Sequence, residues 1–249
     1  MGDSQNNVQA KSLINRPKIS VCLASYNGEQ VIERQLKSIL PQLGDNDEVI
    51  ISDDYSTDQT SVVVSRCMDY RIKFIYNENR KGPVGNFQHA LERSTGDIIF
   101  LSDQDDIWLP EKVNSTLILL QQYDLVLTDC KVVDANLCEL YPSFFSARGS
   151  KSGLVRNLYK NSYMGCCMAF RRTILEYALP FPTHIYMHDW WIGLLVELKG
   201  KVYFNSTPMI LYVRHGNNVS PTGEESYSFL RKFYNRFWLI LALLSRLLF

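Results

Sequence analysis

The chain has 249 residues, and its 26 lysines and arginines balance its 26 aspartates and glutamates. This balance argues against a nucleic-acid partner, and the length suits one α/β domain with a modest extension. The six cysteines show no C-x-x-C spacing and include the adjacent pair Cys166 and Cys167, which argues against a zinc site or a disulfide framework and favours reduced thiols in a cytosolic protein.

Residues 1–17 are polar and lack the apolar core of a secretory signal peptide, so we expect a polar leader there. From Lys18 onwards, short apolar runs alternate with helical patterns. We expect strands over 19–24, 48–52, 72–76, 97–101 and 125–128, and helices near 29–40, 58–68, 85–93 and from Pro110. Alternation of this kind is typical of βαβ units. It predicts an α/β fold with a Rossmann-like, doubly wound, mostly parallel sheet.

The pattern loosens between Cys130 and Tyr163, where we expect a long functional loop. The doubly wound half of the chain therefore ends near residue 130. Downstream we expect a strand over 166–170, a helix from Thr173, a helix through 190–198, and strands over 201–205 and 209–213.

The segment from Tyr227 to Phe249 is dense in aromatic and aliphatic residues. Its uninterrupted apolar run, Phe237–Leu244, has 8 residues, against the roughly 20 that span a bilayer. We expect an amphipathic helix over 225–249 that lies in a membrane surface. The alternative is a helix packed on the core or on a second subunit. The expected apolar stripe comprises Phe229, Phe233, Phe237, Ile240, Leu241, Leu244 and Phe249, and the basic residues are Arg231, Lys232, Arg236 and Arg246.

Three carboxylates, Asp103, Asp105 and Asp106, follow the apolar run at 97–101. That run indicates a strand buried on both faces, and open α/β sheets bind ligands at the carboxyl ends of such strands. Carboxylates packed there raise one another's pKa values unless a cation arrives, and Mg²⁺ or Mn²⁺ suits oxygen ligands. Because Mg²⁺ takes one or two carboxylates plus phosphate oxygens, the cluster predicts a diphosphate substrate. The alternatives are a solvated acidic turn and a structural Ca²⁺ site.

Two further strand-to-helix turns, Ser25–Gly28 and Asp53–Asp58, are expected at the same edge of the sheet. Tyr26 could stack on a base, and Asp54 could accept the imide N–H of uracil or thymine. For Ser56 and Asp58, helix capping is at least as good an interpretation as ligand contact.

Together these motifs resemble those of family 2 glycosyltransferases, which have the GT-A fold. The resemblance covers roughly 18–220, and it implies a nucleotide-binding half over about 18–130 and an acceptor half over about 131–220. Its most specific parts are Ala24–Asn27, Ile51–Asp58 and Gly96–Trp108.

The resemblance implies roles for residues in these motifs. Tyr26 and Asp54 would bind the pyrimidine base of the donor. The D-x-D carboxylates, Asp103 and Asp105, would bind Mn²⁺ or Mg²⁺ and the donor diphosphate, with Asp106 in a supporting place. The other residues expected to border the donor are Ala24, Asn27, Asp53, Lys81 and Asn86.

A second catalytic element follows Pro180 and Pro182, in the segment His188–Trp191. Asp189 matches the acid that serves as general base in the resembling family, and His188 stands where a Glu is usual. Inverting transfer needs a carboxylate to take the acceptor hydroxyl's proton. The alternative for Asp189 is a stabilising residue at a helix N-terminus.

After the last expected strand, the run Tyr212–Asn218 is similar to one in bacterial rhamnosyltransferase-like members. The similarity implies that His215 contacts the metal or the diphosphate and that Arg214 contacts a phosphate. A lone His is otherwise most often structural or a surface residue.

The resemblance and the tail together imply an inverting, metal-dependent transfer from a UDP- or dTDP-sugar to a polyprenyl-diphosphate-linked saccharide. Such an enzyme would build O-antigen or capsule at the cytoplasmic face of the plasma membrane. The sequence leaves open whether the protein forms a homodimer. A nucleotidyltransferase would need a Gly-rich basic phosphate loop, which Ser25–Glu29 is not. A non-catalytic nucleotide- or saccharide-binding protein on the same fold remains an alternative.

Overall fold

The structure is a computed structural model that describes residues 16–215 and 228–248. Most of the expected leader, the last five residues of the expected domain, and residues 225–227 and Phe249 of the expected tail lie outside the described residues.

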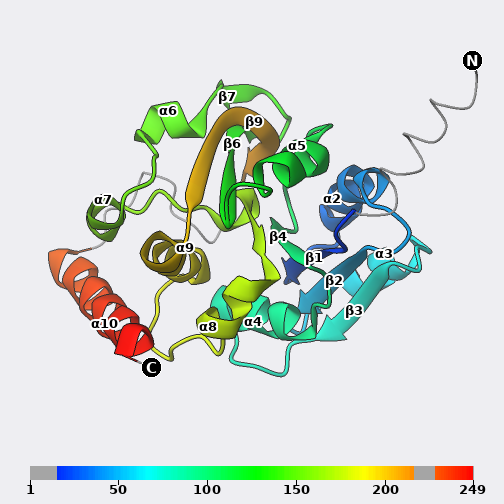
Figure 1. Cartoon of the computed structure of the whole chain (residues 1–249). Helices are drawn as coiled ribbons and strands as arrows, with labels where there is room; N and C mark the ends of the chain where they lie inside the picture. Colours follow the sequence, from blue (N-terminus) through cyan, green and yellow to red (C-terminus); the bar gives the residue numbers. More distant parts are fainter. Residues whose placement is uncertain (1–15, 216–227, 249) are drawn as a thin grey trace, which may run out of the picture.

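A nine-stranded mixed sheet forms the centre of the described chain (Figure 1). Its strand order is β3-β2-β1-β4-β8-β6-β9-β5, and β7 pairs with β6. Pairing is parallel from β3 through β4 and between β6 and β9, whereas β8, β5 and β7 run antiparallel to their neighbours. The predicted mostly parallel α/β sheet is confirmed. The strands are β1 (Ile19–Ser25), β2 (Glu48–Asp53), β3 (Ile72–Tyr76), β4 (Ile98–Asp103), β5 (Ile107–Trp108), β6 (Leu125–Asp134), β7 (Glu139–Tyr141), β8 (Met168–Arg171) and β9 (Val202–Arg214).

Helices cover both sides of the sheet, with α2 on one side of β1 and β2 and α4 on the other (Figure 1). The chain order reverses between β1 and β4, so the ligand-binding crevice is expected there. The helices are α2 (Ile32–Ile39), α3 (Thr60–Ser65), α4 (Pro83–Arg93), α5 (Lys112–Leu119), α6 (Phe144–Arg148), α7 (Leu154–Tyr159), α8 (Leu175–Ala178), α9 (His188–Lys199) and α10 (Phe229–Leu248), with 3₁₀ turns at Leu40–Gln42, Gly165–Cys167 and Arg172–Ile174.

Strand β4 carries branched and aromatic side chains that are buried on both faces, as the sequence predicts. Side chains of this kind stabilise the fold by roughly 1.5–3 kcal/mol each when they leave water. This burial fixes the end of β4, and with it the acidic residues that follow.

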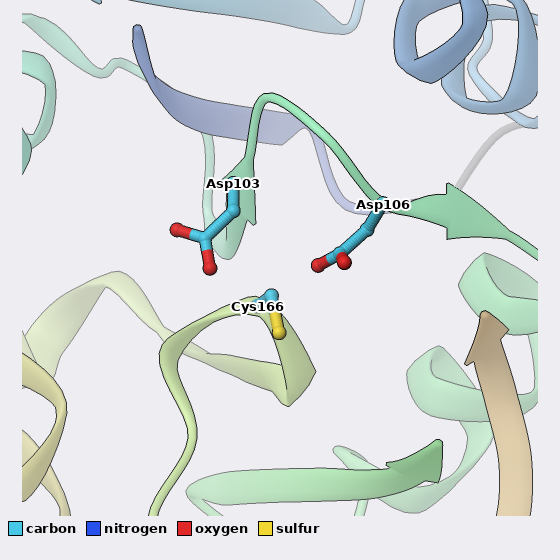
Figure 2. A group of neighbouring side chains, drawn as sticks. All are labelled: Asp103, Asp106 and Cys166. Carbon is cyan, nitrogen blue, oxygen red and sulfur yellow. The ribbon is translucent and has the colours of Figure 1, made fainter. Parts of the chain in front are cut away.

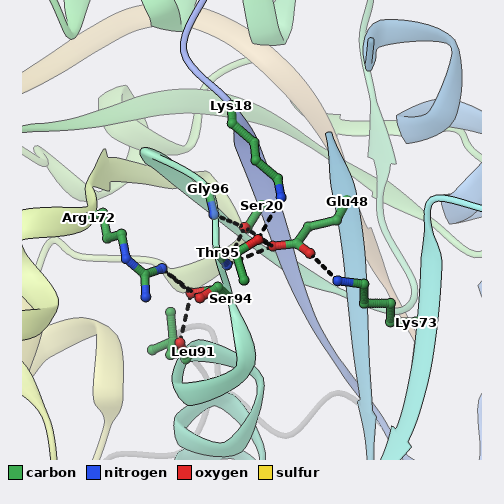
Figure 3. Close-up of polar contacts among 9 residues, drawn as sticks. All are labelled: Lys18, Ser20, Glu48, Lys73, Leu91, Ser94, Thr95, Gly96 and Arg172. Atoms are coloured by element: carbon green, nitrogen blue, oxygen red, sulfur yellow. Dashed lines mark hydrogen bonds and ion pairs between the residues drawn. The ribbon is translucent and has the colours of Figure 1, made fainter. Parts of the chain in front are cut away.

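A polar cluster near the amino ends of β1 and β2 joins these strands to β3 and to the segment before β4 (Figure 3). Glu48 accepts hydrogen bonds from Ser20 Oγ at 2.6 Å, from Thr95 N–H at 2.7 Å and from Lys73 Nζ at 2.7 Å. Burial alone would raise the pKa of Glu48, but these hydrogen bonds, with that of Lys73 the largest, lower it to about 2. The cluster therefore anchors the strands that present the first two loops.

Three expectations need correction. The strands expected over 201–205 and 209–213 form one strand, β9. Register shifts on both sides of Asp129 in β6 allow β9 to continue through Pro208 and the two exposed residues before it. The helix expected from Pro110 begins at Lys112, because Glu111 has a left-handed φ of 67°. The loop expected over 130–163 holds the end of β6, β7, α6 and α7.

Helix α10 packs on the core by one face only. Leu239 and Leu243 are buried, the Trp238 ring lies 4.5 Å from the His184 ring, and Arg236 Nε donates to the Leu158 carbonyl at 3.0 Å. No described helix is apolar enough over a sufficient length to cross a bilayer. The opposite face leaves a row of large apolar side chains exposed: Leu230, Phe233, Tyr234, Phe237, Ile240, Leu241, Leu244 and Leu247.

Candidate active site

A cavity of about 1760 Å³ opens where β1, β2 and β4 end. Typical small-molecule pockets measure roughly 300–1,000 Å³, so this cavity has room for two substrates side by side. Its lining includes most of the predicted site residues, namely Ala24, Tyr26, Asn27, Asp54, Asn86, Asp103, Asp105, Asp189 and His215. Three others lie outside the lining: Asp53, Lys81 and Arg214.

Gln104 holds the loop after β1 in place. Its Oε1 accepts the Tyr26 N–H and its Nε2 donates to the Tyr26 carbonyl, both at 2.9 Å. A Cβ at Gly28 would lie 2.4 Å from Gln104 Oε1, so the amide approaches this closely only because residue 28 is glycine. The Tyr26 ring stays 55% exposed at the cavity, where an aromatic face is available for stacking.

Asn27 ties the first loop to the second. Its Oδ1 accepts the Thr57 N–H at 2.9 Å, and its own N–H donates to Ser56 Oγ at 2.8 Å. Asp58 accepts from the N–H of Thr60 at 3.0 Å and holds the turn that precedes α3. The hydrogen bonds of Ser56 and Asp58 therefore stabilise these turns.

The two adjacent acids at the end of β2 have different environments. Asp53 is fully buried and accepts hydrogen bonds from Ser25 Oγ at 2.7 Å and from Ser56 N–H at 2.7 Å. Asp53 lies outside the cavity lining, and its carboxylate holds the turn from inside. Asp54 faces the cavity, and its oxygens accept from Asn77 Nδ2 and from the Gly82 N–H, each at 2.8 Å.

Asn86, in the first part of α4, lies beneath the same loops. Its Nδ2 donates to the Ser25 carbonyl at 3.0 Å, and within the described residues its buried Oδ1 has no hydrogen-bond partner. A donor group on a bound ligand would satisfy that oxygen.

The acids after β4 form a cluster with one cysteine. A carboxylate oxygen of Asp103, one of Asp106 and the Cys166 sulfur lie within 4.8 Å of one another (Figure 2). Burial, and then the neighbouring Asp105, raise the pKa of Asp103 to about 8 and that of Asp106 well above its ordinary value. Asp106 Oδ2 is buried and has no hydrogen-bond partner in the described part of the chain. Such a carboxylate beside further ligand atoms fits a divalent cation.

Asp105 points to the end of β9, where His215 Nε2 lies 2.6 Å from its Oδ2. Asp106 Oδ1 accepts the Val213 N–H at 3.2 Å. The loop after β4 is thus tied to β9, which brings both predicted metal-binding segments together.

Asp189 lies in the first turn of α9 and is 5% exposed. Burial raises the pKa of Asp189 to about 6, although the Trp190 N–H and the Gly165 N–H donate to its two oxygens. The neighbouring His188 stacks on Phe87 with ring centroids 4.0 Å apart, and burial lowers its pKa to about 3. Both groups are in their basic form at neutral pH, and the higher pKa makes Asp189 the stronger base of the pair.

The far end of the cavity carries four cations, which we call the basic end: Arg148, Lys160, Lys232 and Arg236. Arg148 and Lys160 are not among the predicted site residues, because the sequence predicts a loop where α6 and α7 lie. Lys232 and Arg236 were expected only as membrane contacts of the tail. A repeated spacing of basic residues, the usual signal for such a surface, is lacking here.

The family model of "Glycosyl transferase family 2" matches residues 20–179. The chain belongs to this family. Among curated family 2 relatives, it is 28% identical over 72% of its length to the Escherichia coli UDP-Glc:alpha-D-GlcNAc-diphosphoundecaprenol beta-1,3-glucosyltransferase WfgD, covering 69% of that protein. It is 27% identical over 79% of its length to the Shigella flexneri dTDP-rhamnosyl transferase RfbG, covering 72%. The chain is therefore a family 2 glycosyltransferase.

Solved structures show the same GT-A fold. Staphylococcus aureus TarS 1-349 in complex with UDP has a TM-score of 0.69 at 22% identity, over 91% of this chain and 65% of that one. Other solved structures of the fold hold Mn²⁺ with UDP or with GDP-mannose. The chain spans about two thirds of the length of the proteins it matches first.

Proposed function

We propose that this chain is an inverting glycosyltransferase that transfers a hexosyl group from a UDP- or dTDP-sugar to a polyprenyl-diphosphate-linked saccharide. The observation that carries this proposal is the convergence of Asp54, Asp103 and Asp189 on one cavity. The names of WfgD and RfbG specify a UDP-glucose donor and a dTDP-rhamnosyl transfer, and that of WfgD a diphosphoundecaprenol acceptor.

The donor would lie between the loops after β1, β2 and β4. The Tyr26 ring can stack on the pyrimidine, and Asp54 has lone pairs left to accept the imide N–H after its bonds to Asn77 and Gly82. Asp103 and Asp105 would hold Mn²⁺ or Mg²⁺ beside the diphosphate, with Asp106 and His215 next to them. When bound, the cation supplies Lewis-acid stabilisation of the departing diphosphate.

Asp189 would act as the general base. One of its oxygens takes the proton of the acceptor hydroxyl, while the hydroxyl oxygen forms a bond to the anomeric carbon. The bond from that carbon to the diphosphate oxygen breaks on the opposite face, and the nucleoside diphosphate leaves with the electron pair. The two backbone N–H groups that donate to Asp189 fix the direction of its remaining lone pairs.

Helix α10 would bring the enzyme to the inner face of the plasma membrane. Its exposed apolar row faces away from the domain, and Arg231 near the start of the helix is exposed, a pattern that suits anionic lipid. Lys232 and Arg236 instead line the cavity, and Arg246 donates to the Pro180 carbonyl. The apolar side chains would enter the boundary between headgroups and acyl chains.

The test is transfer from a panel of UDP- and dTDP-sugars to short-chain polyprenyl-diphosphate-linked saccharides, with Mn²⁺ or with a chelator. We expect one donor to react only with metal present, with inversion at the anomeric carbon. Wild-type protein that binds a nucleotide yet transfers no sugar from any donor would instead support a non-catalytic binding protein.

A further inference from the structure

Charge is distributed unevenly along the cavity. The acids of its lining are Glu29, Asp54, Asp58, Asp103, Asp105 and Asp189, all in the loops after β1, β2 and β4 or at the start of α9. In contrast, the described lining residues that come from α6, from 159–164 and from α10 include the four cations and no acid. A concave surface of one charge sign concentrates ligands of the opposite sign. The basic end therefore suits an anion other than the donor, whose diphosphate belongs beside the acids and their cation.

The cations of the basic end keep donor capacity for a ligand. Lys160 Nζ donates to the Arg148 carbonyl at 2.8 Å, which leaves two of its three N–H groups. The Arg148 guanidinium lies 5.6 Å from the Phe144 ring. Within the described ranges, no carboxylate forms an ion pair with Arg148, Lys160 or Lys232. Charge-assisted hydrogen bonds to phosphate oxygens would use this capacity.

Arg236 connects the basic end to the candidate base. Its guanidinium donates to the carbonyls of Leu158 and Tyr159 and lies 5.7 Å from the Trp190 ring. Trp190 follows Asp189 directly, and its Nε1 donates to the Asn157 carbonyl at 2.8 Å. An anion at the basic end would thus lie near Trp190, next to the candidate base, and Arg236 holds the end of α7 beside it.

Apolar surface begins where the basic end stops. Phe233 lines the cavity and is 63% exposed, and Phe237, one turn further along α10, is 47% exposed. A ligand with its anionic group at Lys160 and Lys232 could extend an apolar chain along these rings. Few ligands that carry a saccharide also have both an anionic group and a long apolar chain.

We propose that the basic end is the subsite for the diphosphate of a polyprenyl-diphosphate-linked acceptor. Arg148, Lys160 and Lys232 contact the phosphate oxygens, and the polyprenyl chain leaves past Phe233 along α10 into the membrane. This inference rests on the proposed function, and it adds the residues that recognise the acceptor's diphosphate and the direction in which the lipid leaves.

The test measures binding, so that it does not depend on turnover. Farnesyl diphosphate is titrated into the wild-type protein and into the variants Lys160→Gln, Lys232→Gln and the double variant, with UDP and Mn²⁺ present to fill the donor site and again without them. Lys151→Gln is the matched control, because Lys151 is an exposed lysine of the same region that does not line the cavity. All three lysines are exposed, so each variant should fold.

We expect each single variant to raise the Kd for farnesyl diphosphate by about tenfold and the double variant by about a hundredfold. Lys151→Gln should match the wild type, and farnesyl monophosphate should bind more weakly than the diphosphate. Equal Kd values in all variants would overturn the proposal. It would also be overturned if only binding to phosphatidylglycerol vesicles weakened, because the lysines would then contact membrane headgroups. Binding of the diphosphate without any sugar transfer would instead refute the proposed function and keep this subsite.

Discussion

His215 Nε2 lies 2.6 Å from Asp105 Oδ2 and so joins the end of β9 to the loop after β4, 110 positions earlier in the chain. This contact places the last strand of the domain beside the acidic cluster. His215 is thus placed to hold Asp105 in position or to share a bound cation with it.

For His215→Ala, we expect the affinity for UDP or dTDP in the presence of Mn²⁺ to fall about 10- to 100-fold, because ligands and their hydrogen-bond partners carry losses of this size. Calorimetric titration with and without the metal measures the effect. Affinity in Mn²⁺ equal to that of the wild type would remove His215 from the donor site.

For Asp189→Asn, we expect transfer to fall by at least about a hundredfold, as is typical for loss of a general base. Donor affinity should stay within about twofold, since the proposed donor site is formed by the other acids. Because the pKa of Asp189 is raised to about 6, the base form is present above that value and is lost as pH falls through it. The wild-type rate should therefore decline below about pH 6. Transfer that persists in the variant would assign the base elsewhere.

Metal binding should release protons near neutral pH. Asp103 has a pKa of about 8 when no cation is bound, so it is largely protonated at pH 7, whereas a metal ligand must be ionised. We expect Mn²⁺ to displace about one proton per ion. Calorimetry in buffers of different ionisation enthalpy counts these protons, and the Asp103→Asn variant is the control. Equal heats of Mn²⁺ binding in all buffers would contradict the assignment of Asp103 as a metal ligand.

For Glu48→Gln, we expect the free energy of unfolding to fall by about 2 kcal/mol, because the buried hydrogen bonds to a charged group are weakened and Lys73 loses its ion pair. The pKa of Glu48 is lowered from 4.5 to about 2, so its stabilising effect is complete above pH 4.5 and is lost as pH falls towards 2. Denaturant unfolding of both proteins at several pH values tests this, and the difference should shrink in acid. If the difference in the free energy of unfolding did not change with pH, the substitution would act through packing and not through the charge of Glu48.

For the double variant Phe237→Ser and Leu241→Ser, we expect loss of binding to anionic vesicles with little change in melting temperature, since both side chains are exposed on α10. Vesicle co-sedimentation is the measurement, and Leu239→Ser is the contrasting change, because Leu239 is buried and its loss should destabilise the fold. A wild-type dimer that the double variant converts to a monomer would make this face a subunit interface.

The strand β4 and the acids that follow it could be predicted from the sequence because a buried strand and its carboxyl end are local features. The loops at Tyr26 and Asp54 followed from the same alternation. In contrast, the fixed place of Asp53 inside the turn depends on Ser25, which is distant in the sequence. A single sequence does not show which of two adjacent acids faces inward.

The basic end could not be predicted, because its cations come from α6, the end of α7 and α10, and their meeting is a property of the tertiary fold. Similarly, the sequence predicts two strands where β9 lies, because Asn205–Pro208 has the composition of a turn. In the structure, β9 stays paired with β6 on both sides of this segment and is one strand. Tertiary contacts outweighed local preference in both places.

The most direct test of the account is titration of the purified protein with UDP and with dTDP, each with and without Mn²⁺, in the wild type and in Asp105→Asn. We predict that one nucleotide binds the wild type only when Mn²⁺ is present, and that Asp105→Asn loses most of this affinity. Binding that is independent of the metal, or no binding of either nucleotide, would contradict it.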